Sequence, residues 1–170
     1  MATANHNLSN YDKATIPNAK DFRFGIVVSE WNDTITEGLY NGAVEALKDC
    51  GALDDRITRW NVPGSYELIY GCKKMQSNNV DVVIAIGSVI QGETKHFDYV
   101  CQGATSGIMS IGLRYNKPAT FCVLTDQNEQ QSIDRSGGKH GNKGTECAIS
   151  CLKMIELNKD ISSPDKKIGF

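Results

Sequence analysis

The residues best suited to chemistry in this sequence gather around one short segment, Gly92 to His96. His96 stands two residues after Thr94, and we expect a helix to begin here. The free backbone N–H groups at the start of a helix can bind an anion, and Gly92 would let that anion approach closely. The same helix dipole disfavours an imidazolium, so His96 would be a neutral proton acceptor. A lone histidine is also commonly structural, which leaves the alternative open.

Other candidates are scattered along the chain. Trp31 lies in a polar loop, where its indole would either stack on a heteroaromatic ring or cover the edge of a sheet. Glu67 would lie in the first turn of a helix, as a ligand or as a simple cap. Arg135 would either bind a phosphate through paired N–H groups or end a helix in solvent. Lys143 is not in a Walker A loop, because a helix precedes its segment and a glycine follows it.

Four apolar runs predict the strands that must position these residues. The runs are Phe24 to Ser29, Arg56 to Val62, Asp81 to Gly87 and Ala119 to Leu124. Apolar residues recur at helical spacing in five other segments, and these predict helices. The predicted helices cover residues from about 35 to 51, 65 to 75, 97 to 113, 128 to 135 and 142 to 157.

The alternation of strands and helices predicts an α/β fold: a three-layer α/β/α sandwich around a four-stranded parallel sheet. In such sheets, ligands bind outside the carboxyl ends of the strands. The candidate residues follow the strands as this rule requires. We therefore expect a single domain over residues 23–158, a flexible arm over residues 1–22 and a tail over residues 159–170.

Charge and cysteine content exclude several kinds of protein. The chain has 18 basic and 20 acidic residues and a net charge of −2, which argues against a nucleic-acid or anionic-membrane partner. No apolar run is long enough to span a membrane, and the amino terminus does not resemble a secretory signal, so we expect a cytoplasmic protein. The six cysteines include no CxxC pair and should be reduced, mostly buried thiols. Cys147 and Cys151 have no further ligands nearby, so no metal site is expected.

Four segments of the chain resemble the 6,7-dimethyl-8-ribityllumazine synthase family. They are GIVVSEWN (25–32), VPGSYEL (62–68), GSVIQGETKHFDYV (87–100) and the stretch from Val123 through Arg135 to Gly144. The resemblance extends over about residues 22–158. It implies a flavodoxin-like sheet and the condensation of 5-amino-6-(D-ribitylamino)uracil with 3,4-dihydroxy-2-butanone 4-phosphate. The products would be the lumazine, phosphate and water, in the penultimate step of riboflavin biosynthesis, with no metal or organic cofactor.

The resemblance also implies a role for each site residue. His96 would transfer protons, and Glu93, Thr94 and Arg135 would hold the phosphate, with the Glu93 side chain turned outward. The pyrimidine substrate would contact a larger set of residues, of which Phe121 and Lys143 come from the adjacent subunit. That set is Trp31, Ser65, Tyr66, Glu67, Ser88, Val89, Ile90, Phe121 and Lys143.

Members of the family form pentamers or shells of sixty subunits. The compact segment from Arg135 to Gly144 is similar to that of the shell formers, so we expect a homo-oligomeric shell, with riboflavin synthase as a candidate partner. Two other interpretations stay open. A flavin-binding or storage module would also suit Trp31 and an anion site. A response-regulator receiver fits less well, because the third strand ends in Ile86-Gly87-Ser88 rather than in an aspartate.

Overall fold

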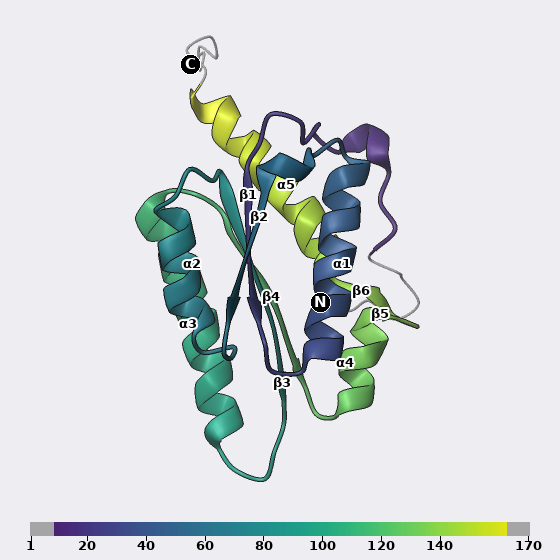
Figure 1. Cartoon of the computed structure of the whole chain (residues 1–170), viewed down its shortest axis with the longest axis vertical. Coiled ribbons are helices and arrows are strands. Elements are labelled where there is room, and N and C mark those ends of the chain that lie inside the picture. Colours follow the sequence, from purple (N-terminus) through teal and green to yellow (C-terminus); the bar gives the residue numbers. More distant parts are fainter. Residues whose placement is uncertain (1–8, 163–170) are drawn as a thin grey trace, which may run out of the picture.

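A four-stranded, wholly parallel sheet forms the middle layer of the molecule (Figure 1). The computed structural model describes residues 9–162, and the side chains up to Asn158. The strands are β1 (Phe24–Ser29), β2 (Ile57–Val62), β3 (Val82–Ile90) and β4 (Ala119–Asp126), in the order β2-β1-β3-β4. The predicted parallel sheet is confirmed.

Helices cover both faces of this sheet, which confirms the predicted three layers. They are α1 (Asp33–Asp49), α2 (Leu68–Gln76), α3 (His96–Tyr115), α4 (Glu129–Arg135) and α5 (Lys143–Ser162). Figure 1 shows α1, α4 and α5 on one side of the sheet, and α2 and α3 on the other. Two short 3-10 turns, Lys13–Thr15 and Asp54–Arg56, precede β1 and β2.

Each face of the sheet has its own apolar core. Ile26 and Ile84 pack with residues of α1 and α5, whereas Val27 and Val83 pack with residues of α2 and α3. Successive side chains of a strand point to opposite faces, so a strand between two helical layers must be apolar throughout. All six residues of β1 are buried, Ser29 included. The continuous apolar runs in the sequence have this physical cause.

The observed strands extend beyond the predicted ones at the end where ligands would bind. β3 continues past Gly87 to Ile90, and β4 continues past Leu124 to Asp126. The two strands pair in unbroken register from Val83 with Ala119 to Ile90 with Asp126, so backbone pairing continues where the apolar run has ended. These residues therefore lie on a rigid element rather than in a loop.

The segment between α4 and α5 contains a small antiparallel pair of strands. β5 (Ser136–Gly138) and β6 (Gly141–Asn142) pair with each other just before α5 begins. Gly137 and Gly141 have φ angles of +123° and +83°, which side chains of L-residues rarely permit. Glycine at these two positions allows the tight turn between α4 and α5.

Residues 9–22, the described part of the expected arm, lie against the domain. Ala19 and Phe22 are buried in the core, and Tyr11 and Lys13 both contact the Asp49 carboxylate at 2.9 Å. Residues 1–8 and the side chains of the expected tail lie outside the described residues. The domain boundaries inferred from the sequence stay a prediction.

The cysteines are free thiols, as expected, and all except the half-buried Cys101 are buried. Burial raises the pKa of Cys72 to about 12, so this thiol stays protonated at neutral pH. In the described part of the chain, no three histidine, cysteine or acidic residues gather as a metal site would need. Nor is any helix of that part long and apolar enough to cross a membrane.

Candidate active site

A cavity of about 610 Å³ lies at the carboxyl ends of β1, β2 and β3. Parallel strands place their following loops at one edge of the sheet, which is why residues far apart in the sequence meet here. Eight of the predicted site residues line this cavity, from the ends of three strands and the segments that follow them. They are Trp31, Ser65, Tyr66, Glu67, Ser88, Val89, Ile90 and His96.

Trp31 follows β1 and presents its indole to solvent at the cavity. Its backbone N–H donates to the carbonyl of Pro63 at 3.3 Å, which ties the loop after β1 to the loop after β2. The side chain is 72% exposed. An indole this open within one chain does not cover the edge of the sheet, and a stacking role fits it better.

Asn32 fixes this loop, although the sequence did not single it out. It has a left-handed backbone, with φ of 59°, and directly precedes α1. Its side-chain amide donates to the carbonyl of Ser88 in β3 at 3.0 Å. The sequence signal was the position of Asn32 between an aromatic residue and a helix start, since asparagine tolerates left-handed geometry better than other side chains.

We expect Asn32→Ala to destabilise the protein by about 1–3 kcal/mol, because alanine is strained at this φ and loses the bond to β3. Urea unfolding measures the change. Asn32→Gly is the matched control: it removes the same hydrogen bond without the strain, and should cost less. An alanine variant as stable as the wild type would contradict this account of the loop.

A chain of polar contacts runs beneath the cavity. The Ser65 hydroxyl donates to the carbonyl of Ser88 at 3.5 Å, and the Ser88 hydroxyl lies 3.4 Å from that of Ser132 in α4. Ser132 in turn donates to an Asp126 carboxylate oxygen at 2.7 Å. A Cβ at position 87 would lie 2.6 Å from the Ser65 hydroxyl oxygen, so Gly87 makes room for this contact. The cavity floor is thus joined to the end of β4.

His96 is the first residue of α3 and is exposed. Its backbone N–H donates to the Thr94 hydroxyl at 3.4 Å. Residues 92–94 lie just before the helix rather than in its first turn, and all three are exposed. The outward orientation expected for the Glu93 side chain stays a prediction. A Cβ at position 92 would meet no atom within 4 Å, so that side of the Gly92 backbone is open to a ligand.

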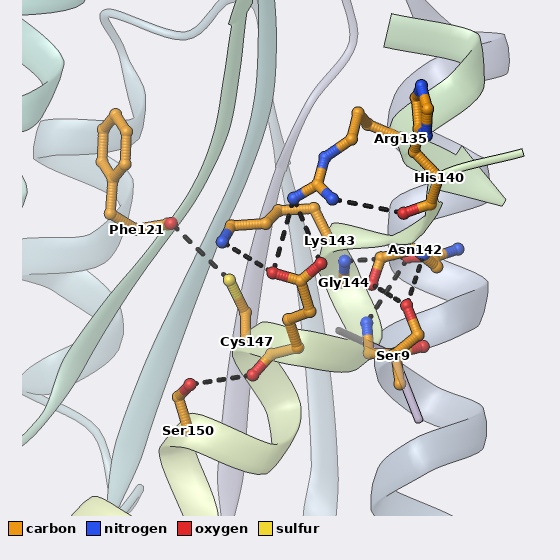
Figure 2. A network of polar contacts seen from close by, with 11 residues as sticks. Ser9, Phe121, Arg135, His140, Asn142, Lys143, Gly144, Cys147 and Ser150 are labelled. Atoms are coloured by element: carbon orange, nitrogen blue, oxygen red, sulfur yellow. Dashed lines mark hydrogen bonds and ion pairs between the residues drawn. The ribbon is translucent and has the colours of Figure 1, made fainter. Parts of the chain in front are cut away.

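Arg135 and Lys143 form a second cluster (Figure 2). Neither residue lines the cavity. Arg135 ends α4 and Lys143 begins α5, and both form ion pairs with Glu146, at 3.1 Å and 2.9 Å. Arg135 also donates to the carbonyl of His140 at 3.2 Å. No sequence pattern pointed to Glu146, although its place three residues after Lys143 puts both on one helix face.

Phe121 lines neither the cavity nor the second cluster with its side chain, which packs against the core on the α2 and α3 side of the sheet. Its carbonyl in β4 accepts a contact of 3.6 Å from the thiol of Cys147, the residue next to Glu146 (Figure 2). One chain therefore divides the predicted residues among three places. Trp31 to His96 gather at the ends of β1, β2 and β3, and Arg135 and Lys143 meet at the start of α5. The Phe121 ring lies on the other face of the sheet from α5.

Asn142 holds the second cluster on the body of the protein. Its side-chain amide donates to the carbonyls of Gly38 in α1 and Ser136 in β5, at 2.8 Å and 3.1 Å. The side-chain oxygen accepts from the N–H of Gly144 at 2.8 Å. Asn142 thus fixes the entry to α5, and with it the direction in which Lys143 leaves the backbone.

Comparison with known proteins shows close similarity over nearly the whole chain. A family model described as 6,7-dimethyl-8-ribityllumazine synthase matches residues 21–159. A protein of that name from Flavobacterium johnsoniae is 69% identical over 163 residues, which are 95% of this chain and 86% of the relative. Its namesake from Flavobacterium psychrophilum is 67% identical over 160 residues, 94% of this chain and 85% of the relative. A third, from Christiangramia forsetii, is 63% identical over 162 residues, 94% and 96% of the two chains.

Proposed function

This chain belongs to the 6,7-dimethyl-8-ribityllumazine synthase family, and from that membership we propose that two subunits build each of its active sites. The enzyme makes 6,7-dimethyl-8-ribityllumazine for riboflavin biosynthesis. It condenses 5-amino-6-(D-ribitylamino)uracil with 3,4-dihydroxy-2-butanone 4-phosphate. The residues that carry out this reaction would be divided between two copies of the chain.

One observation carries the proposal. His96 lines the cavity with Trp31 and Glu67, whereas Arg135 forms its ion pair with Glu146 elsewhere on the same chain. A reaction that needs proton transfer next to a bound phosphate needs both groups at one place. A closed ring of identical subunits satisfies this need, because it puts one surface of each chain against a different surface of the next.

The cavity would bind the pyrimidine substrate. The exposed indole of Trp31 would stack on the pyrimidine ring, and the exposed Glu67 carboxylate would accept hydrogen bonds from ribityl hydroxyls. Ser65 and Tyr66 would complete the contacts on that side. Ser88, Val89 and Ile90 would bind the ring through backbone groups, which is why it matters that β3 continues to Ile90 as a rigid strand.

The neighbouring subunit would supply the rest of the site. Phe121 and Lys143 would close the cavity over the pyrimidine, and Arg135 would bind the phosphate together with the backbone at Glu93 and Thr94. A guanidinium can hold a phosphate through two parallel N–H groups. The exposed segment from Gly92 to Thr94 is open enough to receive that phosphate.

The chemistry then proceeds in steps that balance. The uracil amine attacks the ketone carbon and water leaves, which gives a Schiff base. A proton is removed and inorganic phosphate leaves by elimination. The second amine closes the ring as a second water departs. His96 would move the protons, worth roughly 10²–10⁴-fold in typical enzymes, while holding two substrates in register replaces much of the entropic barrier.

We propose that the subunits assemble into a shell of sixty, built from pentamers. The support is the short turn made by β5 and β6, which agrees with the compact segment expected of shell formers. Such a shell could enclose riboflavin synthase. We also place the enzyme in the cytoplasm, because a phosphorylated substrate does not cross membranes unaided.

Light scattering tests the assembly. Sixty copies of an 18.6 kDa chain would weigh about 1.1 MDa, and a lone pentamer about 93 kDa. We expect the larger mass. A mass at or below that of the pentamer would contradict the shell, and a monomer would contradict the shared site as well.

Turnover tests the site. The purified protein, mixed with both substrates, should produce the absorbance and fluorescence of the lumazine without any added metal or cofactor. A yellow protein that carries stoichiometric flavin and turns over neither substrate would instead support a flavin-storage role.

A further inference from the structure

We propose that Glu146 is a positioning residue, which holds Arg135 in the orientation that binds the phosphate-bearing substrate. This inference rests on the proposed function, because it takes Arg135 as the phosphate ligand. Glu146 has no role in the site as derived so far. The contacts, the burial and the charge of Glu146 support this positioning role.

The Glu146 carboxylate forms ion pairs with both cations of the second cluster. One oxygen, Oε2, accepts from the Lys143 ammonium at 2.9 Å and from the Arg135 guanidinium at 3.4 Å. The other oxygen, Oε1, lies 3.1 Å from the same guanidinium. Only 9% of the Glu146 side chain is exposed, against 18% for Arg135 and 28% for Lys143. The carboxylate is thus the most buried of the three charged groups, and both cations contact it.

Charge explains why the carboxylate is needed. Two cations held close together repel each other, and a carboxylate between them removes that repulsion. The three groups together keep one net positive charge, which remains available to an anion. Without Glu146, each cation would be free to turn away from the other and toward solvent.

Arg135 keeps unused donors in this arrangement. A guanidinium carries five N–H groups, and the described contacts of Arg135 go to His140 and Glu146 only through its two terminal nitrogens. Oε1 of Glu146 is buried and, within the described part of the chain, accepts no well-aligned hydrogen bond. Its contact with Arg135 is therefore mainly electrostatic, so it fixes the position of the guanidinium without consuming every donor on that side.

The same turn of α5 connects the cluster to β4. Cys147, which follows Glu146, contacts the carbonyl of Phe121, and Asn142 fixes the start of the helix. Glu146 therefore belongs to a rigid helix end and does not move independently. A carboxylate is also favoured near a helix amino terminus, which adds to its fixed position. A rigid partner is what a bidentate phosphate ligand requires.

The test is steady-state kinetics of Glu146→Gln with each substrate varied in turn. We expect the KM for 3,4-dihydroxy-2-butanone 4-phosphate to rise roughly 10-fold or more, since charge-assisted contacts of this kind are worth 10-fold or more in binding. The KM for the pyrimidine should change less. The two substrates should differ because Arg135, the proposed phosphate ligand, must be oriented to bind with two N–H groups. Lys143, the proposed pyrimidine contact, acts as a point charge whose donors rotate freely. The inhibition constant of inorganic phosphate should rise by the same factor as the KM of the phosphorylated substrate.

Three variants separate positioning from a general loss of structure. Glu45→Gln removes the same charge from an exposed site on α1 and should leave both KM values unchanged. Glu146→Asp keeps the charge but is one methylene shorter, so it should give an intermediate KM even if Glu146→Gln fails to assemble. The double variant Glu146→Gln with Arg135→Ala should bind the phosphorylated substrate no more weakly than Arg135→Ala alone, because Glu146 acts through Arg135.

Two outcomes would overturn the inference. One is an unchanged KM for the phosphorylated substrate in Glu146→Gln or, if that variant does not assemble, in Glu146→Asp. The other is an equal rise of the KM for both substrates, which would indicate a general disturbance of the site; a smaller fraction of folded enzyme would lower the apparent kcat alone. If Arg135→Ala itself leaves that KM unchanged, the proposed role of Arg135 fails first, so the two failures are distinguishable.

Discussion

Arg135→Ala is expected to lower kcat/KM by about 10²–10⁴-fold, because two charge-assisted hydrogen bonds to the phosphate, each worth roughly 1.5–3 kcal/mol, are lost together. His96→Ala is expected to lower it no more than that. His96 is exposed at the start of α3, so water can take over part of its proton transfer. Steady-state kinetics of the two variants, measured side by side, makes the comparison.

This ranking follows from the nature of the reaction. An amine, a ketone and a phosphate leaving group are reactive once they are aligned, so the enzyme contributes chiefly by holding two substrates in register. The residue that anchors one substrate then matters at least as much as the residue that moves a proton. Arg135→Lys is the matched variant: it keeps the charge but loses the paired geometry, and should lie between the wild type and Arg135→Ala. Near-normal kcat/KM for Arg135→Ala would refute the ranking.

The sequence predicted the cavity well because the cavity depends on topology. Each apolar run is a strand, each strand ends at the same edge of a parallel sheet, and Trp31, Glu67 and His96 follow three of those ends. Nothing beyond strand order is needed to bring them together. Asn32 was missed for the opposite reason, since its role depends on a single left-handed residue and one bond to β3.

The second cluster could not be predicted from periodicity. Arg135 and Glu146 are eleven residues apart, and they meet because Gly137 and Gly141 permit a tight turn between two helices. The spacing of apolar residues does not predict such a turn. The separation of Arg135 from His96 was equally hidden, because the resemblance assigned only Phe121 and Lys143 to the adjacent subunit and left Arg135 beside His96.

Co-assembly of two damaged chains is expected to restore activity, and this is the sharpest test of the shared site. His96→Ala and Arg135→Ala chains, each almost inactive alone, are unfolded, mixed in equal amounts and refolded together. If a site takes His96 from one subunit and Arg135 from its neighbour, random mixing leaves about a quarter of the sites with both residues intact. We expect about a quarter of wild-type activity per subunit, measured as lumazine formation.

The matched control mixes His96→Ala with Trp31→Ala. Both residues line the same cavity of one chain, so no arrangement of these two chains yields a site with both intact. Activity should stay at the average of the two variants. Recovery in the control as well would point to a nonspecific effect of refolding. If the His96 and Arg135 variants stay inactive in assemblies shown by mass to contain both chains, the shared site is wrong, and Arg135 must then act within its own chain or not at all.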